Sequence, residues 1–361
     1  MKITSHPLHL STNGNLFFMR QTITLHGRPI GGSAPCFIIA EACDNHLGNL
    51  ETAKEMVCQA KACGADAIKF QHHLPDEEML RDGVPMSANF NMPLYEFLQR
   101  YALNLDQHYE LKRYCEQLGV IYLCTPFSRK AAEEIHEMGV CAFKIGSGEM
   151  TDLPTLKVIA RFGKPVILST GMCDFHEIEE TVNTLRPIND QLILMNCTSE
   201  YPARHADVNL GVIRELEQRF HLVVGHSDHT PDIWTCVAAA ALGAKLLEKH
   251  IILDRRQPGP DQSVSIEPYE LSQLVTAVRR VEEALGNRKT VHELERPIRT
   301  WAHRSVVSLK PIDRGTSITP DMVWTKRPGT GIPAKQLDEV IGRIAKVDIP
   351  ANHLVRWEEL K

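Results

Sequence analysis

Two short runs in the second half of the chain carry imidazoles that could bind a metal ion. They read His226-Ser227-Asp228-His229 and Glu248-Lys249-His250, and each ends an apolar segment. A histidine that ends a strand is more often hydrogen-bonded in the core than a ligand, and His226 offers a competing pair with His229. Two imidazole ligands would leave the other positions to water and substrate. Such an open, oxygen-rich shell suits Mn²⁺ or Mg²⁺ acting as a Lewis acid better than structural zinc.

Polar residues also end the apolar runs further upstream. These residues are Glu41, Lys69, Thr125, Lys144 and Ser169. When so many buried strands end in polar side chains, the pattern indicates one shared active site at that end of the strands.

Lys69 and Lys144 close two of these strands, and burying an ammonium group without an anion is costly. A bound acid or phosphate would supply the anion. A neighbouring carboxylate such as Asp66 or Glu149 is the alternative partner.

Small residues follow two of the strands. Gly146-Ser147-Gly148-Glu149 comes after Lys144, and Ser169-Thr170-Gly171 ends the next unit. Glycine and serine let backbone N–H groups and hydroxyls approach phosphate oxygens, although the same residues occur in ordinary turns. Glu41 and Glu149 suit hydroxyl binding or general base catalysis if burial raises their pKa, whereas Glu41 could equally be the partner of a barrel lysine.

The elements that must position these residues alternate short apolar runs with longer amphipathic ones, which predicts eight strand–helix units. The expected strands are Phe37 to Glu41, Ala67 to Gln71, Ile121 to Thr125, Ala142 to Ile145, Pro165 to Ser169, Ile193 to Cys197, Leu222 to Ser227 and Leu246 to His250. Eight units favour a closed (β/α)8 TIM barrel. A doubly wound open sheet would place a ligand at one switch point instead of at nearly every strand end.

The chain is predicted to contain four segments. Residues 1–36 form an N-terminal extension with a hairpin at Thr22 to Gly32, residues 37–286 form the barrel, 287–300 a charged linker and 301–361 a small second domain. A domain of about 60 residues buries only a modest core, so we expect it to dock on a larger surface.

Composition limits the classes of partner. The 361 residues hold 40 Lys and Arg against 45 Asp and Glu, a formal charge of −5, which argues against nucleic-acid or anionic-membrane binding. The ten cysteines form no CxxC pair, and the chain shows no signal peptide or membrane-length apolar run. We therefore expect a soluble, reduced, cytoplasmic protein.

The ordered motifs make the chain resemble the sialic acid synthases. The motifs are Ile38-Ile39-Ala40-Glu41, Asn45-His46, Gly64-Ala65-Asp66, Lys69-Phe70-Gln71, Thr125-Pro126-Phe127, Lys144-Ile145-Gly146-Ser147-Gly148-Glu149, Ser169-Thr170-Gly171-Met172, Cys197-Thr198-Ser199-Glu200-Tyr201-Pro202, Gly225-His226-Ser227-Asp228-His229-Thr230, Glu248-Lys249-His250 and Pro258-Gly259-Pro260-Asp261. The segment Lys326-Arg327-Pro328-Gly329-Thr330-Gly331 is similar to the antifreeze-like (SAF, β-clip) domain of these enzymes.

The resemblance implies a metal-dependent transferase that condenses phosphoenolpyruvate with an N-acetylated hexosamine and water. His229 and His250 would bind the metal ion, and Glu149 would be the base for the attacking water. Lys69 and Thr125 would hold the carboxylate of phosphoenolpyruvate. The phosphate would be held by Lys144, Ser147, Ser169 and Ser227, with Ser199 nearby.

The resemblance also implies how the sugar is held. Glu41, Tyr201 and Asp261 would contact it. Arg327 would reach it from the small domain of a partner chain in a domain-swapped homodimer. Because pseudaminate synthases lack the Pro-Gly-Pro-Asp segment, Asp261 favours N-acetylneuraminate as the product, with legionaminate, made from 2,4-diacetamido-2,4,6-trideoxymannose, as the alternative. A non-catalytic carbohydrate- or ice-binding protein would have no reason to hold Lys69 and Lys144 together with the two histidines.

Overall fold

The computed structural model describes residues 22–87 and 89–361, so residues 1–21 of the predicted N-terminal extension lie outside the described part. The chain divides into two compact units, Met1–Leu285 and Gly286–Lys361. Each unit is described by itself. In the described residues no helix is both long and apolar enough to cross a membrane.

The first unit is built on eight parallel strands, which confirms the predicted TIM barrel. They are β3 (Phe37–Glu41), β4 (Ala67–His72), β5 (Ile121–Pro126), β6 (Phe143–Ile145), β7 (Val166–Ser169), β8 (Leu192–Cys197), β9 (Val223–Asp228) and β10 (Leu246–His250). The pairing order is β5-β4-β3-β10-β9-β8-β7-β6, and β5 also contacts β6, which brings the two ends of the sheet together. Every predicted strand lies within one or two residues of an observed one.

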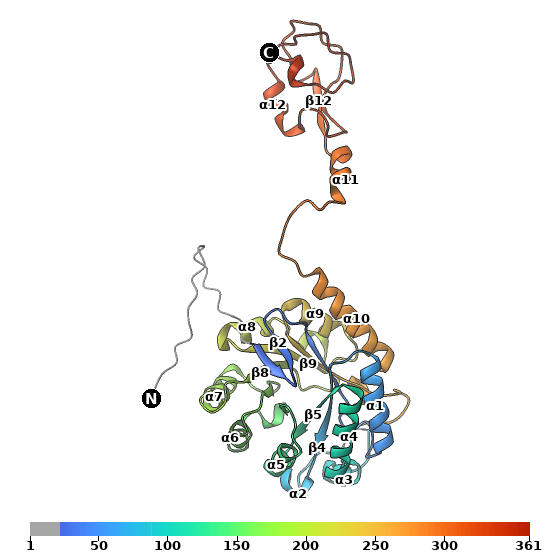
Figure 1. The fold of residues 1–361 in the computed structure, drawn as a ribbon, viewed down its shortest axis with the longest axis vertical. Helices are drawn as coiled ribbons and strands as arrows, with labels where there is room; N and C mark the ends of the chain where they lie inside the picture. The colour runs from blue at the N-terminus through green and yellow to red at the C-terminus, as the bar shows by residue number, and fades with distance from the viewer. Residues whose placement is uncertain (1–21, 88) are drawn as a thin grey trace. The chain divides into compact units, whose positions relative to one another are not determined.

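Helices surround the strands on the outside, as the blue-to-orange part of Figure 1 shows. They are α1 (Leu50–Ala62), α4 (Leu105–Leu118), α5 (Arg129–Glu137), α6 (Leu153–Arg161), α7 (Phe175–Leu185), α8 (Val212–Phe220), α9 (Trp234–Leu242) and α10 (Pro268–Ala284). Side chains cap several N-termini: Asn104 and Gln107 form a capping box on α4. Gly119 ends that helix in the left-handed conformation, φ 69°, which glycine adopts without steric cost.

Alternating side chains give the strands two apolar faces. One face packs against the helices and includes Ile38, Ile68 and Phe70. The other fills the barrel interior and includes Ile39 and Leu123. The hairpin of β1 (Thr22–Leu25) and β2 (Arg28–Gly31) adds Ile23, Leu25 and Ile30 to this interior cluster. The hairpin thus packs on the core at the amino ends of the strands and leaves their carboxyl ends to the polar residues.

Two short helices between β4 and α4 were not expected from the sequence. They are α2 (Pro75–Glu78) and α3 (Leu94–Tyr101). The first is only 4 residues long, and the second is an 8-residue helix that buries Tyr95, Phe97 and Leu98. Both are too short to show a clear periodic pattern within a stretch rich in proline and asparagine.

The second unit has its own small core. Its strands β11 (Ser305–Ser308) and β12 (Val323–Lys326) pair antiparallel, and α11 (Glu295–Ala302) and α12 (Leu337–Val340) are its helices. The core holds aliphatic residues such as Val306, Ile318 and Val355. This fold is mostly irregular backbone around a few short bridges, as expected for a domain of this size.

Candidate active site

The carboxyl ends of the barrel strands surround one cavity of ≈ 630 Å³. Most of the residues that the sequence singled out line it, namely Glu41, Lys69, Thr125, Lys144, Ser147, Glu149, Ser169, Ser199, Tyr201, Ser227, His229 and His250. Asp261 lines an adjoining cavity, and Arg327 lies in the second unit. The barrel therefore brings together residues from eight separate strand ends, while the role of each stays a prediction.

Two buried lysines and two buried carboxylates form the floor of the cavity. Lys69 Nζ lies 2.8 Å from Glu41 Oε2 and donates to Thr125 Oγ1 at 2.9 Å. Lys144 Nζ donates to Ser169 Oγ at 2.7 Å and lies 3.3 Å from Glu248 Oε1. The carboxylate partners are thus not Asp66 or Glu149, the two that the sequence suggested.

Glu248 lies within ion-pair distance of both lysines. Its Oε1 lies 3.7 Å from Lys69 Nζ and accepts a hydrogen bond from Ser227 Oγ at 3.1 Å. Burial raises the pKa of Glu248, but the charges of Lys144 and Lys69 outweigh burial and lower that pKa to about 2. Burial lowers the pKa of Lys69, and the charges of Glu248 and Glu41 raise it above its ordinary value. The opposite charges of Glu248 and Lys69 therefore each favour the ionised form of the other group.

Hydroxyls and glycines line the wall beside Lys144. The backbone N–H of Gly171 donates to Ser147 Oγ at 3.1 Å. A Cβ atom on Gly171 would overlap Ser199 Oγ and Ser147 Oγ, and one on Gly146 would overlap the carboxyl group of Glu149. A larger residue at either position would therefore displace these polar side chains, which pack directly against the glycine backbone.

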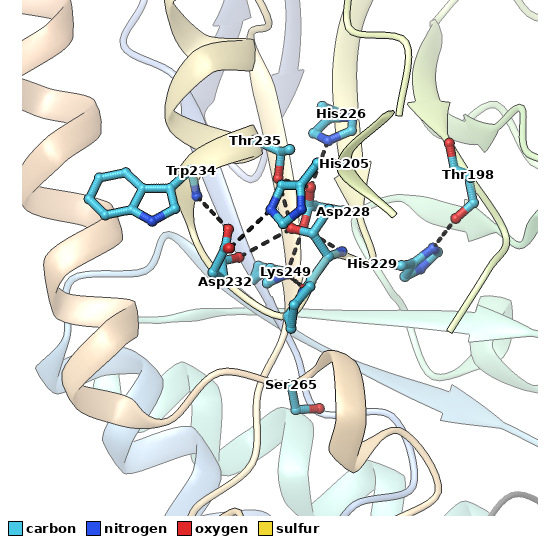
Figure 2. Close-up of polar contacts among 12 residues, drawn as sticks. Thr198, His205, His226, Asp228, His229, Asp232, Trp234, Thr235, Lys249 and Ser265 are labelled. Atoms are coloured by element: carbon cyan, nitrogen blue, oxygen red, sulfur yellow. Dashed lines mark hydrogen bonds and ion pairs between the residues drawn. The ribbon is translucent and has the colours of Figure 1, made fainter. Parts of the chain in front are cut away.

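The two predicted metal ligands lie side by side on β9 and β10. The ring centroids of His229 and His250 are 5.1 Å apart. His229 Nδ1 donates to the carbonyl oxygen of Thr198 at 2.7 Å, a contact drawn in Figure 2. The proton on Nδ1 leaves Nε2 with a lone pair, which lies 2.9 Å from the hydroxyl of Tyr201. A backbone carbonyl that fixes the tautomer in this way is typical of a metal-binding histidine.

The donor set near His250 fits a cation. Its buried Nδ1 has no hydrogen-bond partner and lies 3.3 Å from Asp261 Oδ2. One donor atom each from Cys43, His250 and Asp261 lies within 4.8 Å of the others. Burial, and then the charge of Asp261, raises the pKa of Cys43 well above its usual value, so this thiol is protonated without a cation. Cys43 was not predicted as part of the site.

Glu149 lies across the same cavity on the 3-10 helix Ser147–Glu149. Its Oε2 is buried without a hydrogen-bond partner in the described structure. Burial raises the pKa of Glu149 above its ordinary value. A carboxylate with a free oxygen and a raised pKa has the properties of a general base.

Behind the histidines lies a buried network that Figure 2 shows around Asp228. Lys249 Nζ donates to Asp228 Oδ1 at 2.5 Å and to the carbonyl oxygen of Thr230. The carboxylate also accepts from Thr230 N at 3.0 Å and from the hydroxyl of Thr235. Burial raises the pKa of Asp228, but hydrogen bonds and charges from His226 and Lys249 lower it far below the usual range. This network fixes the ends of β9 and β10, from which His229 and His250 project.

His226 belongs to the same network and is not a competing ligand. Its Nδ1 lies 3.0 Å from the carbonyl oxygen of Asn196, and its Nε2 lies 3.0 Å from Asp228 Oδ2. Both ring nitrogens are therefore engaged, and His226 does not line the cavity.

In the second unit, Arg327 follows β12. Its Nε donates to the carbonyl oxygen of Ala302 at 3.1 Å, and its guanidinium lies 5.1 Å from the centre of the Trp301 ring. With Lys326 and Arg356 it lines a cavity of ≈ 440 Å³. The exposed guanidinium is available for an acidic or amide-bearing partner.

Sequence analysis missed three residues of the main cavity that the structure places beside predicted ones. Gln71 Nε2 donates to Glu41 Oε1 at 2.8 Å, Cys197 Sγ lies 3.5 Å from Ser147 Oγ, and Glu248 joins the lysines. Gln71 and Glu248 could have been predicted from strand periodicity, because residues two apart on a strand point to the same face. Gln71 lies two residues from Lys69, and Glu248 lies two residues from His250.

Comparison with known proteins gives matches over both units. The model of the NeuB family matches residues 56–290, and that of the SAF domain matches residues 303–361. The chain is 36% identical to the N,N'-diacetyllegionaminic acid synthase of Legionella pneumophila, covering 92% of this chain and 97% of that one. It is also 36% identical to the human N-acetylneuraminate-9-phosphate synthase, covering 92% and 94%.

A solved structure is similar as well. The N-acetylneuraminic acid synthetase of Leptospira borgpetersenii matches with a TM-score of 0.71 and 32% identity, covering 78% of this chain and 96% of that one.

Proposed function

The chain belongs to the NeuB family and carries a C-terminal SAF domain, and from this premise we propose that it condenses phosphoenolpyruvate with an N-acylated hexosamine and water. The products are a nine-carbon 2-keto acid and phosphate. The observation that carries the proposal is the single cavity that holds two buried ammonium groups, Lys69 and Lys144, together with two adjacent imidazoles, His229 and His250.

Phosphoenolpyruvate is an anion at both ends, and the cavity offers cations and hydroxyls at matching places. Lys69 and Thr125 hold its carboxylate; their Nζ and Oγ1 atoms are already 2.9 Å apart. Lys144, which donates to Ser169 at 2.7 Å, holds the phosphate. The phosphate is also held by Ser147, Ser199 and Ser227, which line the same cavity. Charge-assisted hydrogen bonds of this kind bind and orient the substrate.

His229 and His250 would hold a divalent cation, Mn²⁺ or Mg²⁺. When bound, such a cation supplies Lewis acidity at the aldehyde oxygen of the sugar. In the reaction C3 of phosphoenolpyruvate forms a bond to the aldehyde carbon, whose oxygen takes up a proton and becomes a hydroxyl, and C2 becomes electron-deficient. Water then adds to C2 and loses one proton. The bond between C2 and the phosphate oxygen breaks, phosphate leaves with the electron pair, and loss of the second water proton gives the 2-keto group.

Glu149 accepts the proton of the attacking water. Its buried, unpartnered Oε2 and its raised pKa support this role. The rigid floor supports the chemistry in a different way, because Glu248 and Glu41 hold the two lysines in place before substrate arrives. A preorganised site of this kind avoids the cost of ordering charged groups during the reaction.

The sugar lies between the imidazoles and the cavity wall. Tyr201, whose hydroxyl is 2.9 Å from His229, and Asp261, 3.3 Å from His250, are placed to contact it. Glu41 binds a hydroxyl from the floor. Arg327 contacts the N-acyl group from the small domain of a second copy, so the active form is a domain-swapped homodimer.

N-acetylmannosamine is the proposed acceptor, which makes the product N-acetylneuraminate. The Pro258-Gly259-Pro260-Asp261 segment supports this choice over a pseudaminate precursor. The second candidate is 2,4-diacetamido-2,4,6-trideoxymannose, with legionaminate as the product, because a relative of 36% identity is named N,N'-diacetyllegionaminic acid synthase.

The experiment measures phosphate release from phosphoenolpyruvate with Mn²⁺, comparing the two sugars at equal concentration. Faster release with N-acetylmannosamine supports the proposed acceptor, and faster release with the diacetamido sugar selects legionaminate. Release with neither sugar contradicts the proposed reaction. Glu149→Gln serves as the matched inactive control for contaminating phosphatase.

A further inference from the structure

A second cavity of ≈ 400 Å³ adjoins the first. The two share five lining residues, Gln71, Leu94, Phe127, Glu149 and Tyr201, so they form one continuous space. The floor with the lysines belongs to the first cavity alone. The second is lined by both carboxylates and apolar side chains.

One oxygen of a buried carboxylate in this second cavity has no hydrogen-bond partner. Asp44 is only 4% exposed, and its Oδ1 accepts no hydrogen bond in the described structure. His46 Nε2 lies 3.8 Å from this oxygen, which is beyond hydrogen-bond distance. A buried carboxylate oxygen without a donor is costly, so this atom is ready to accept a hydrogen bond from a ligand.

The one cationic side chain of the cavity is already committed. His73 Nδ1 lies 3.1 Å from both carboxylate oxygens of Glu78, and its Nε2 lies 3.4 Å from Asp44 Oδ2. Its ring stacks on Phe127 with the centroids 4.2 Å apart. The Nε2 atom also lies 3.1 Å from Gln71 Oε1. Two carboxylates, this amide oxygen and an aromatic face therefore hold the imidazole, which leaves neither ring nitrogen free to donate to a further anion.

The balance of charge is negative. Asp44, Glu78, Glu149 and Asp261 line the cavity, against His73 alone, and no lysine or arginine lines it in the part of the barrel unit that the structure describes. Apolar side chains also line the cavity, including Met79, Phe97 and Leu98. Such a surface suits a hydroxyl or amide N–H beside a methyl group, and it repels a phosphate.

The position of the second cavity indicates which end of the acceptor enters it. Tyr201 and Asp261 contact His229 and His250 and also line the second cavity. An acceptor whose aldehyde lies at the imidazoles thus extends its remote end past these two side chains. That end becomes C9 of the nine-carbon product, because phosphoenolpyruvate contributes C1 to C3.

We propose that the cavity lined by Asp44, His73 and Glu78 is the subsite for the remote end of the acceptor, and that it admits a neutral end and excludes a phosphorylated one. This inference rests on the proposed function and deepens it. It sets the chain apart from the relative named N-acetylneuraminate-9-phosphate synthase, although the two are 36% identical.

The test compares N-acetylmannosamine with N-acetylmannosamine 6-phosphate as acceptors, with kcat/KM measured by phosphate release and products identified by mass spectrometry. The wild-type protein should use the phosphorylated sugar at least about 10²-fold less efficiently, because like charges in one pocket are strongly unfavourable. Asp44→Asn and Glu78→Gln should each reduce the preference for the unphosphorylated sugar, measured as the ratio of the two kcat/KM values, by at least about tenfold. Glu77→Gln is the matched control, since Glu77 is exposed, neighbours Glu78 on α2 and lines neither cavity.

Equal or better use of the phosphorylated sugar by the wild-type protein would overturn the inference while leaving the proposed function intact. An unchanged ratio of kcat/KM between the two sugars in Glu78→Gln would also overturn the inference, and this variant remains informative if Asp44→Asn does not fold. Phosphate release with no sugar at all would instead contradict the proposed function. If only the diacetamido sugar is turned over, the phosphorylated sugar should fail to compete with it, and inhibition as strong as that by N-acetylmannosamine would overturn the subsite.

Discussion

Removing either member of the buried Asp228–Lys249 pair should destabilise the barrel, but the two removals should not cost the same. Lys249 is fully buried and has two acceptors, Asp228 Oδ1 and the carbonyl oxygen of Thr230. In Asp228→Asn the ammonium group loses the one carboxylate that lies within ion-pair distance of it among the described residues. Leaving one charge of a buried pair uncompensated costs about 3–5 kcal/mol.

Removing Lys249 instead leaves the Asp228 carboxylate, which keeps most of its hydrogen bonds. In Lys249→Met the carboxylate of Asp228 keeps its donors from His226, Thr235 and both the N–H and hydroxyl of Thr230. We therefore expect a loss of about 1–3 kcal/mol, the cost of one charged hydrogen bond and some packing. The double variant removes both charges, so its loss should fall short of the sum by about 1–3 kcal/mol.

Urea unfolding followed by circular dichroism at 222 nm measures these differences. The signal reports mainly the barrel, because α1 and α4 to α10 all lie in the first unit. Equal losses for the two single variants, or a double variant whose loss equals the sum, would refute the assignment of Asp228 as the centre of the network.

The remaining predictions concern turnover. Glu149→Gln should lower kcat at least about 10²-fold while both substrates still bind. Because burial raises the pKa of Glu149, the kcat/KM of the wild-type protein should fall as the pH drops through that raised value. The same fall in kcat/KM at low pH in the variant would contradict the role of Glu149 as a base. His250→Ala should lose Mn²⁺ binding in titration calorimetry with the fold unchanged, and full affinity would remove it as a ligand. Gly171→Ala should raise the KM for phosphoenolpyruvate at least about tenfold, since the methyl group displaces the hydroxyls of Ser147 and Ser199; an unchanged KM would place the phosphate elsewhere. Co-expression of Glu149→Gln with Arg327→Ala, each inactive alone, should restore about a quarter of wild-type turnover if Arg327 acts on the partner, and no recovery would contradict the domain swap.

The sequence predicted the strands of the barrel well because each is a mainly apolar run and most carry a polar residue near the carboxyl end. Glu41, Lys69 and Ser169 each lie within the last four residues of their strands. The alternation of side chains along a strand could also have shown which histidine of the His226-to-His229 motif faces the cavity. Ser227 and His229 line the cavity, while His226 and Asp228 do not.

The partners of the lysines could not be predicted in the same way. Glu248 reaches Lys69 and Lys144 because the ring of strands brings β10 beside β3 and across from β6, a neighbourhood set by the whole barrel. The acidic cavity was missed for a related reason. Asp44 and His73 follow different strands, and Glu78 lies on a helix of 4 residues that leaves no periodic signal.

The most direct test of the central claim follows one oxygen atom. Phosphoenolpyruvate labelled with ¹⁸O at the bridge between C2 and phosphorus is incubated with N-acetylmannosamine, Mn²⁺ and the protein, and both products are analysed by mass spectrometry. If water adds to C2, an unlabelled nine-carbon 2-keto acid and labelled inorganic phosphate will form in equal amounts. Label retained in the sugar product, or labelled phosphate without any nine-carbon acid, would contradict the proposed condensation.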